Sequence, residues 1–404
     1  MITAEGLTAR MESLADVGVR AEGIYRMAWS EEDASTRAWF ERQAAGDGLR
    51  TARDPAGNLW ACPDSAAPWW GIGSHLDSVR GGGQFDGPLG VVCGFEIAAS
   101  APRPVAVISF ADEEGARFNT PTFGSKALSG RLDLPAVLDR RDDGDVTLRD
   151  AMRAAGVDPD GLGDAPPWLE KLRGFVEIHI DQTTELARAG EPVAVVSSLA
   201  ARTRLEVRLA GRADHAGTTP RSERRDALSA AARLIVGAEE EAGADSPLDG
   251  DHPPLTVTVA RIIAKPNAPT TIASEVRLWM DARSPSFAAI DGWRARLDEL
   301  VGELEARTGV EVEVAVASRS DPREFSPDLR AALTRATEDI VGQAGPEVVC
   351  YAGHDAGVLA ERVPAAMLFV RNAPGVSHSP AETVDLEDAA IAARVVARAL
   401  ELVA

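Results

Sequence analysis

Short runs of consecutive apolar residues recur in the first half of the chain and once near its end. The clearest of these runs cover residues 69–73, 104–110, 174–179 and 365–370. Continuous apolar runs of this length are typical of strands buried on both faces of a parallel sheet. An amphipathic helical pattern covers Ala4 to about Ala45, with a helix start signal at Ser30, and residues 89–101 form an apolar helical stretch. The outer parts of the chain therefore predict an α/β fold with a central, mostly parallel sheet.

The pattern changes between residues 203 and 318, where polar and apolar residues alternate. This alternation predicts half-exposed antiparallel strands at 203–209, 254–260, 275–281 and 310–316. Amphipathic helical patterns at 226–242 and 287–307 lie between them. We therefore expect a smaller, ferredoxin-like α+β domain at 203–318, inserted into a larger domain made of residues 1–202 and 319–404.

Composition narrows the classes of function. The 404 residues carry a formal net charge of −21, which argues against nucleic acid or an anionic membrane surface as a partner. Three cysteines lie far apart, so neither a disulfide framework nor a thiolate metal site is expected. The first residues show no secretion signal, and no run is long enough to cross a membrane. We therefore expect a cytoplasmic protein.

Histidines and carboxylates follow each of the four apolar runs. The candidates are His75, Asp77 and Asp86 after the first run, Glu113 and Glu114 after the second, His179 at the end of the third and His378 after the fourth. Taken singly, each could be a solvated loop residue. In open α/β sheets, however, sites lie outside the carboxyl ends of the strands. Four such transitions favour a metal site for Zn, Mn, Co or Ni.

The adjacent carboxylates Glu113 and Glu114 repel each other, so they need either solvent or a cation. Beside a metal, one of them can be a ligand while the other acts as a general base. A solvated pair of acids at a helix start is the alternative. His252, in a Pro-rich segment, is expected to be a loop residue without a role.

The series of motifs resembles the di-metal aminoacylase/carboxypeptidase (zinc exopeptidase) family. It consists of His-x-Asp-x-Val at 75–79, Asp-Gly at 86–87, Glu-Glu at 113–114, His179, and Ser-His-Ser-Pro-x-Glu at 377–382. Within that family, the segments 81–87, 113–118, 177–182, 214–220, 353–356 and 375–382 are similar to one branch. This branch contains N-carbamoyl-L-amino-acid hydrolases, allantoate amidohydrolases and β-ureidopropionases. The motifs occur in order over almost the whole chain.

The resemblance implies two divalent metal ions, Zn or else Mn, Co or Ni. It implies that His75 and His179 hold one ion, that Glu114 and His378 hold the other, and that Asp86 bridges them. Asp77 would orient the His75 ring. Glu113 would be the general base for a metal-bridging hydroxide that attacks the substrate carbonyl.

The resemblance also implies how the substrate is held. His215, on the inserted domain, would stabilise the oxyanion across a homodimer interface formed by that domain. Arg283 would grip a substrate carboxylate, and Gln182 and His354 would line the pocket. The substrate is thus expected to be a small molecule that bears a carboxylate.

Three positions depart from the family pattern, and all of them face the expected substrate. Thr270 stands where an Asn that binds substrate is common, Thr183 stands where Gly is common, and Gly357 replaces a larger side chain. Every expected metal position is present. The departures therefore leave the chemistry intact and the identity of the substrate open.

Three functions are compatible with these sequence features. The first is a hydrolase of linear C–N bonds other than peptide bonds, which cleaves an N-carbamoyl amino acid or an allantoate-like ureido acid. The second keeps the same di-metal site but cleaves an N-acyl amino acid or a dipeptide, and the altered position Thr270 motivates it. The third is a binding protein on the same fold without catalysis, which the presence of both Glu113 and all the ligands disfavours.

Overall fold

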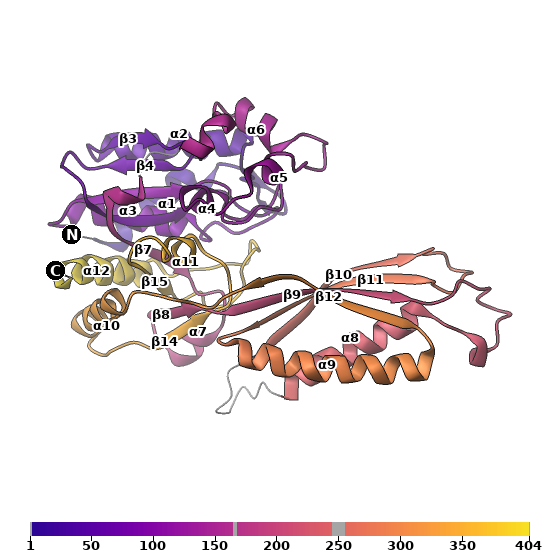
Figure 1. The fold of residues 1–404 in the computed structure, drawn as a ribbon. Coiled ribbons are helices and arrows are strands. Elements are labelled where there is room, and N and C mark those ends of the chain that lie inside the picture. Colours follow the sequence, from indigo (N-terminus) through magenta and orange to yellow (C-terminus); the bar gives the residue numbers. More distant parts are fainter. Residues whose placement is uncertain (1, 165–167, 245–254, 404) are drawn as a thin grey trace. The chain divides into compact units, whose positions relative to one another are not determined.

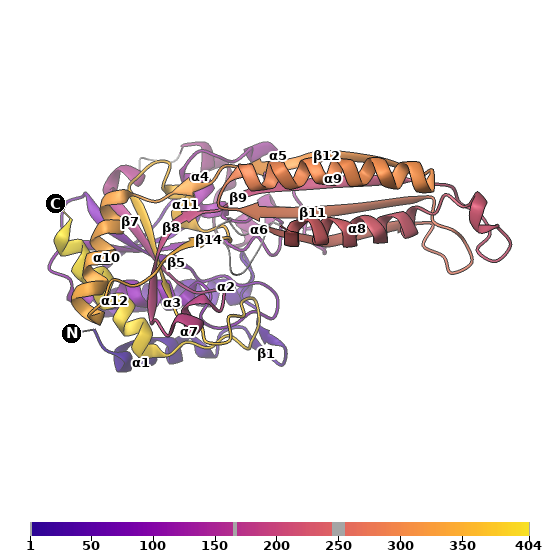
Figure 2. The same cartoon turned by 90° about the horizontal axis from the view of Figure 1, so that it is seen from below.

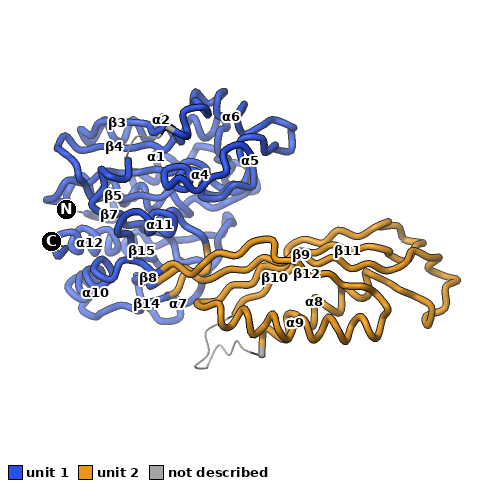
Figure 3. The backbone as a smooth tube through the Cα atoms, in the orientation of Figure 1, with its two compact units in different colours: residues 1–197, 324–348, 353–404 blue, residues 198–323, 349–352 orange. Residues whose placement is uncertain are grey.

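The computed structural model describes residues 2–164, 168–244 and 255–403, and it divides into two compact units (Figure 3). Unit 1 comprises residues 1–197, 324–348 and 353–404, and unit 2 comprises residues 198–323 and 349–352. Unit 2 includes the whole range expected for the inserted domain, 203–318, and also residues 198–202, 319–323 and 349–352, which were expected in the larger domain. His252 lies outside the described residues.

Unit 1 is built on a nine-stranded mixed sheet with strand order β13-β8-β15-β7-β5-β6-β4-β3, in which β14 pairs with β8. Its strands are β3 (Arg50–Arg53), β4 (Leu59–Cys62), β5 (Trp69–His75), β6 (Val105–Phe110), β7 (Leu172–Ile180), β8 (Val193–Leu199), β13 (Arg323–Glu324), β14 (Glu347–Cys350) and β15 (Ala365–Val370). The four central strands β15, β7, β5 and β6 are mutually parallel. They correspond to the four apolar runs of the sequence.

These four strands are apolar because helices cover both faces of the sheet. Every residue of β5, β6 and β15 is buried. Since the strands are parallel and adjacent, their carboxyl ends meet at one edge of the sheet. The residues that follow β5, β6, β7 and β15 are therefore brought together there.

Two helical layers enclose this sheet (Figure 1). The helices of unit 1 are α1 (Ala4–Ala15), α2 (Glu31–Gly46), α3 (Pro88–Ser100), α4 (Phe123–Leu128), α5 (Leu134–Leu138), α6 (Leu148–Ala154), α7 (Glu185–Ala189), α10 (Pro327–Val341), α11 (Asp355–Leu359) and α12 (Leu386–Leu402). Helices α1, α2, α3, α10 and α12 share the largest apolar core with the sheet. A separate apolar cluster joins α4, α5 and α6.

The helical pattern from Ala4 to about Ala45 contains two helices, and the start signal at Ser30 is confirmed as the N-cap of the second. The chain leaves α1 after Ala15, forms the short hairpin β1 (Val19–Arg20) and β2 (Gly23–Ile24), and re-enters a helix at Glu31. Gly18 and Gly23 have positive φ angles of 72° and 129°, a conformation that favours glycine and ends the helical pattern.

Unit 2 has a four-stranded antiparallel sheet of order β10-β11-β9-β12. Its elements are β9 (Ala201–Ala210), α8 (Ala227–Ala244), β10 (Thr256–Lys265), β11 (Glu275–Ser284), α9 (Phe287–Thr308) and β12 (Glu311–Ser320). Figure 2 shows α8 and α9 side by side along the strands, and their apolar residues pack with the inward residues of the sheet. In the described part of the chain, no helix is both long and apolar enough to cross a membrane.

Candidate metal centre

Two groups of possible metal ligands share one carboxylate. His75, Asp86 and His179 form the first group, and Asp86, Glu114 and His378 form the second; within each group the ligand atoms lie within 4.8 Å of one another. Asp86 Oδ1 is 3.0 Å from His179 Nε2 and 3.7 Å from His75 Nε2. Asp86 Oδ2 is 3.7 Å from His378 Nε2. Each oxygen of Asp86 therefore faces a different group, as in a bridging ligand.

The main chain fixes which nitrogen of each buried histidine carries the proton. His75 Nδ1 lies 3.0 Å from the carbonyl oxygen of Asp77, and His179 Nδ1 lies 3.1 Å from that of Ile180. A carbonyl oxygen only accepts hydrogen bonds, so each Nδ1 donates, and Nε2, which is directed towards Asp86, is the nitrogen available to a metal ion. His179 Nε2 is buried and has no hydrogen bond of acceptable geometry among the described residues. This arrangement fits a metal ligand.

Asp86 is held in place by its neighbours. Ser377 Oγ donates to Asp86 Oδ2 at 2.5 Å, and Gln182 Nε2 lies 3.5 Å from the same oxygen and 3.2 Å from Ser377 Oγ. At Gly87, a Cβ atom would lie 2.4 Å from the His75 ring, so this position has no room for a side chain. Ser377 has a role that the sequence did not reveal, because the contact depends on the packing of two distant loops.

Glu382 ties together the loops that carry two of the expected ligands. Its Oε1 accepts the main-chain N–H of His378 at 3.0 Å, and its Oε2 accepts those of Phe85 and Asp86 at 3.4 and 3.3 Å. His378 has φ of 57°, a left-handed conformation that this contact helps to hold. Although Glu382 belongs to one of the recognised motifs, its role as a clamp was not predicted.

Asp77 holds the backbone of the two adjacent glutamates. Its Oδ1 accepts the N–H of Glu113, and its Oδ2 accepts that of Glu114, both at 3.1 Å. The same carboxylate is 3.8 Å from His75 Nδ1, farther than the Asp77 carbonyl oxygen. Asp77 therefore orients His75 through its main chain, while its side chain positions Glu113 and Glu114.

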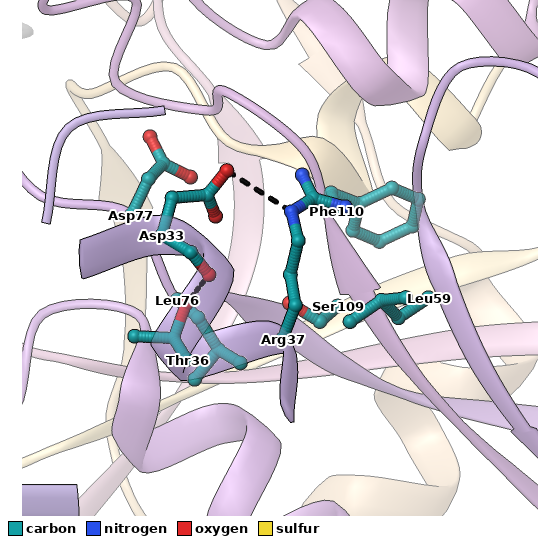
Figure 4. A pocket seen from close by; sticks show the side chains of 8 residues that line it. All are labelled: Asp33, Thr36, Arg37, Leu59, Leu76, Asp77, Ser109 and Phe110. Carbon is teal, nitrogen blue, oxygen red and sulfur yellow. Dashed lines mark hydrogen bonds and ion pairs between the residues drawn. The ribbon is translucent and has the colours of Figure 1, made fainter. Parts of the chain in front are cut away.

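A small cavity of about 10 Å³ lies behind Asp77, and Figure 4 shows its lining. It is lined by Asp33, Thr36, Arg37, Leu59, Leu76, Asp77, Ser109 and Phe110. Arg37 Nε donates to Asp33 Oδ2 at 3.0 Å, and both side chains are buried. The cavity is about large enough for one water molecule. A buried ion pair thus lies beside the carboxylate that positions Glu113.

The two buried glutamates of the centre have raised pKa values, whereas His179 and His75 outweigh the effect of burial and hold the pKa of Asp86 well below its ordinary range. Burial is the main reason that the pKa of Glu113 lies well above its ordinary range; repulsion by Asp355 and Glu114 adds to it, against the attraction of His75. Burial, followed by repulsion from Asp86, raises the pKa of Glu114 to about 8. Such concentrated negative charge is stabilised by bound cations. A carboxylate with a high proton affinity also suits a general base.

Comparisons with known proteins identify the family. Residues 71–402 match the family described as peptidase family M20/M25/M40. The chain belongs to this family. M20 enzymes are metal-dependent hydrolases, in agreement with the two ligand groups around Asp86.

Individual M20 relatives match over nearly their full lengths. An N-carbamoyl-L-amino acid amidohydrolase from Geobacillus stearothermophilus is 35% identical and matches 98% of this chain and 97% of its own. An allantoate amidohydrolase from Bacillus subtilis is 30% identical over 93% of this chain and 92% of its own. A crystal structure of an amidase of the hydantoinase/carbamoylase family from Burkholderia multivorans has a TM-score of 0.85 and 27% identity, covering 99% and 97% of the two chains.

Unit 1 also places His354 next to the expected metal ligands. The ring centroids of His354 and His179 are 4.3 Å apart, and neither ring nitrogen of the buried His354 has a hydrogen-bond partner among the described residues. Glu177, which lies near both rings, already accepts hydrogen bonds from Ser74 Oγ at 2.7 Å and Ala356 N at 2.8 Å. Burial and the neighbouring His179 lower the pKa of His354 well below its ordinary value. His354 is thus a neutral side chain with free polar atoms.

Three of the expected substrate residues belong to unit 2. His215 is exposed, and its Nδ1 accepts the N–H groups of Gly217 and Thr218, both at 3.1 Å. The proton therefore lies on Nε2, which can donate to an oxyanion. The carbonyl of Thr270 accepts the N–H of Ala216 at 2.9 Å, so Thr270 lies beside the His215 loop.

Arg283, at the end of β11, makes two hydrogen bonds within unit 2. Its Nε donates to Asp281 Oδ1 at 2.6 Å, and its Nη1 donates to the carbonyl of Tyr351 at 2.5 Å. The structure thus places His215, Thr270 and Arg283 in one unit and all the expected metal ligands in the other.

A further buried network supports the loop that leads to Glu113, and sequence reasoning missed it. Asn58 Oδ1 accepts the N–H of Ala111 at 2.8 Å, and Asn58 Nδ2 donates to Asp54 Oδ2 at 2.8 Å. Asp54 also accepts the indole N–H of Trp60 and the main-chain N–H groups of Ala56 and Asn58. The only signal in the sequence is a pair of polar residues next to the apolar strand β4.

Proposed function

We propose that this M20 enzyme hydrolyses the carbamoyl group of an N-carbamoyl-L-amino acid or of a related, allantoate-like ureido acid. The observation that carries the proposal is the 35% identity to an N-carbamoyl-L-amino acid amidohydrolase over 98% of this chain. That match extends over both units and thus over the metal centre and the expected substrate residues. Allantoate amidohydrolases at 30% identity support the wider ureido class.

Two divalent ions, Zn or else Mn, Co or Ni, are part of the proposal. His75, His179 and Asp86 would hold one ion, and Asp86, Glu114 and His378 the other. When bound, such ions polarise a carbonyl group and lower the pKa of water. The softness of mixed imidazole and carboxylate ligands is compatible with each of these metals.

Glu113 acts as the general base. It takes a proton from the attacking water, whose oxygen adds to the carbamoyl carbon, and it delivers that proton to the leaving nitrogen as the C–N bond breaks. The products are the free amino acid and carbamate, which decomposes to ammonia and carbon dioxide. The Nε2–H of His215 donates to the oxyanion, Arg283 binds the substrate carboxylate, and Gln182, His354 and Thr270 contact the substrate.

The enzyme is further proposed to be a cytoplasmic homodimer that joins through unit 2 and binds neither nucleic acid nor membranes. Exposed apolar side chains on the edge strand β10 and on α8 support this interface: Ile262, Ile263, Leu228 and Val236. In such a dimer His215 serves the site of the partner subunit. Sedimentation of the wild type and of an Ile262→Asp/Ile263→Asp variant tests the interface, and a monomeric wild type would contradict it.

Ammonia release tests the proposed reaction. Purified protein is supplied in turn with Mn, Zn, Co or Ni and with N-carbamoyl-L-amino acids or allantoate. A Glu113→Gln variant should keep its metal but lose turnover by roughly 10²–10⁴-fold. A metal-loaded Glu113→Gln variant with full activity would refute the mechanism.

One alternative keeps the same centre and changes the bond. Thr270, beside the His215 loop, departs from the residue expected for ureido substrates and favours an N-acyl amino acid or a dipeptide. Product analysis separates the two functions, because an acyl or peptide substrate releases an amine and a carboxylate without ammonia from a ureido group.

A further inference from the structure

Two arginines face each other across neighbouring strands of unit 2. Arg202 on β9 pairs in register with Arg283 on β11. In the same row, β12 contributes Ser320 opposite Arg202, and β10 contributes Thr256 opposite Arg283. Residues directly opposite on antiparallel strands have Cβ atoms about 5 Å apart, and like charges in this position are destabilising. Such a row needs negative charge nearby.

The neighbouring row of cross-strand residues contains one more guanidinium group and one carboxylate. The two rows together therefore hold three positive charges and one negative charge. Arg204 lies opposite Asp281. Asp281 binds Arg204 through Oδ2 at 2.7 Å and Arg283 through Oδ1 at 2.6 Å, so both of its oxygens are occupied. Three guanidinium groups and one carboxylate leave a net charge of about +2 (three minus one) on this patch, within a chain of net charge −21. The patch is thus a local exception to the acidic surface.

Arg202 is the member of the patch without an anionic partner among the described residues. Its Nη2 donates to the neutral Ser320 Oγ at 3.3 Å, and its Nε is buried without a hydrogen-bond acceptor in the described part of the chain. Burial, followed by the charges of Arg204 and Arg283, lowers the pKa of Arg202 against the attraction of Asp281. A buried guanidinium donor without an acceptor is costly unless a ligand satisfies it.

We propose that Arg202 and Ser320 form a second anion subsite beside Arg283, and that the substrate is an N-carbamoyl derivative of a dicarboxylic amino acid. This inference rests on the proposed function, in which Arg283 binds the carboxylate next to the ureido nitrogen. The side-chain carboxylate then lies on Arg202, one strand away. Two guanidinium groups on neighbouring strands match two carboxylates separated by a short aliphatic chain. Arg202 offers its Nε–H, which has no acceptor among the described residues, and Arg283, whose Nε and Nη1 are engaged, offers Nη2.

The test compares dicarboxylates with their neutral amides. Ammonia release is measured as kcat/KM for the N-carbamoyl derivatives of L-aspartate, L-asparagine, L-glutamate and L-glutamine, for the wild type and for Arg202→Gln. We expect the wild type to prefer at least one dicarboxylate by roughly 10- to 100-fold, as a charge-assisted hydrogen bond provides. Arg202→Gln should reduce kcat/KM for that dicarboxylate far more than for its amide.

Arg208→Gln is the matched control. Arg208 lies on the same strand and points to the same face, but it pairs with Glu275 at 3.0 Å. This variant should keep the wild-type preference. Equal turnover of acid and amide by the wild type would overturn the inference, and so would an Arg202→Gln variant that reduces turnover of both equally.

If the proposed function is wrong, the wild type will release no ammonia from any of the four compounds. The subsite is then tested by calorimetry with free L-aspartate and L-asparagine. Tighter binding of aspartate that Arg202→Gln abolishes would still support the anion subsite. Equal binding of the two would overturn it.

Discussion

Ser377 donates a hydrogen bond of 2.5 Å to Oδ2 of Asp86, the carboxylate shared by both ligand groups. Partners of this kind orient a metal ligand, and their loss typically lowers metal affinity by about 10- to 100-fold. We therefore predict that Ser377→Ala weakens metal binding by about tenfold, measured by competition with a chelator.

Ser379→Ala is the control for this change. Ser379 lies in the same loop, and its hydroxyl accepts only the N–H of Ala381 among the contacts described. It should bind metal like the wild type. Unchanged affinity in Ser377→Ala would show that the contact with Asp86 does not tune the centre.

Asp77→Asn should weaken the centre without abolishing it. Both oxygens of Asp77 accept main-chain N–H groups from Glu113 and Glu114, so an amide NH2 would face one of these donors. We expect a 10- to 100-fold loss of metal affinity, with full binding restored at high metal concentration. Titration of the metal-free variant measures this loss. A variant that never binds metal would instead identify Asp77 as a direct ligand.

Arg37→Met should destabilise unit 1 because it leaves Asp33 buried without its ion-pair partner. Removal of one member of a buried pair typically costs about 3 kcal/mol or more. The double variant Arg37→Met/Asp33→Asn should recover part of the loss, which denaturant unfolding measures.

Arg335→Met provides the comparison, because Arg335 pairs with Glu338 at the same 3.0 Å distance but on the surface. It should cost less than about 1 kcal/mol. Equal costs for the two arginines would contradict the importance of burial around the cavity behind Asp77.

Asp54 should make stability depend on pH. Burial raises the pKa of Asp54 from 3.8 to about 6, despite the hydrogen bonds that it accepts. Between about pH 4 and pH 6, the folded protein therefore holds a proton that the unfolded chain has released. The contribution of this group to stability is then present below about pH 4, falls as the pH rises through 6, and is lost well above that value.

Comparison with Asp54→Asn isolates this effect, because all other titrating groups are common to both proteins. The unfolding free energy of the wild type relative to the variant should fall by roughly 2 kcal/mol between pH 4 and pH 6, and by roughly 3 kcal/mol over the whole transition. A rise over this window would mean that the donors from Asn58 and Trp60 outweigh burial and hold the pKa of Asp54 below its ordinary value.

The sequence predicted the central strands of unit 1 because burial on both faces leaves a continuous apolar run. Strands β5, β6, β7 and β15 were each recognised in this way. Strand β3 (Arg50–Arg53) was missed, since this edge strand is largely exposed and carries no apolar pattern. The expected ligands could be named because they directly follow strands or belong to recognised motifs.

What sequence could not provide is the set of contacts between loops that are distant along the chain. Ser377 contacts Asp86, and Glu382 clamps the main chain at Asp86 and His378. The proton position on His75 likewise depends on a carbonyl oxygen, which has no signature in the sequence. These features arise only when the strand ends meet at one edge of the sheet.

Metal content tests the central claim, that Asp86 serves two ions, most directly. The wild type, His378→Ala and Asp86→Ala are loaded with metal and separated from unbound metal. The metal content of each protein is then measured by elemental mass spectrometry. The wild type should hold two ions per chain, and His378→Ala should keep one, on His75 and His179. Asp86→Ala should lose both. An Asp86→Ala protein that keeps one ion, as His378→Ala does, would contradict a shared bridging carboxylate.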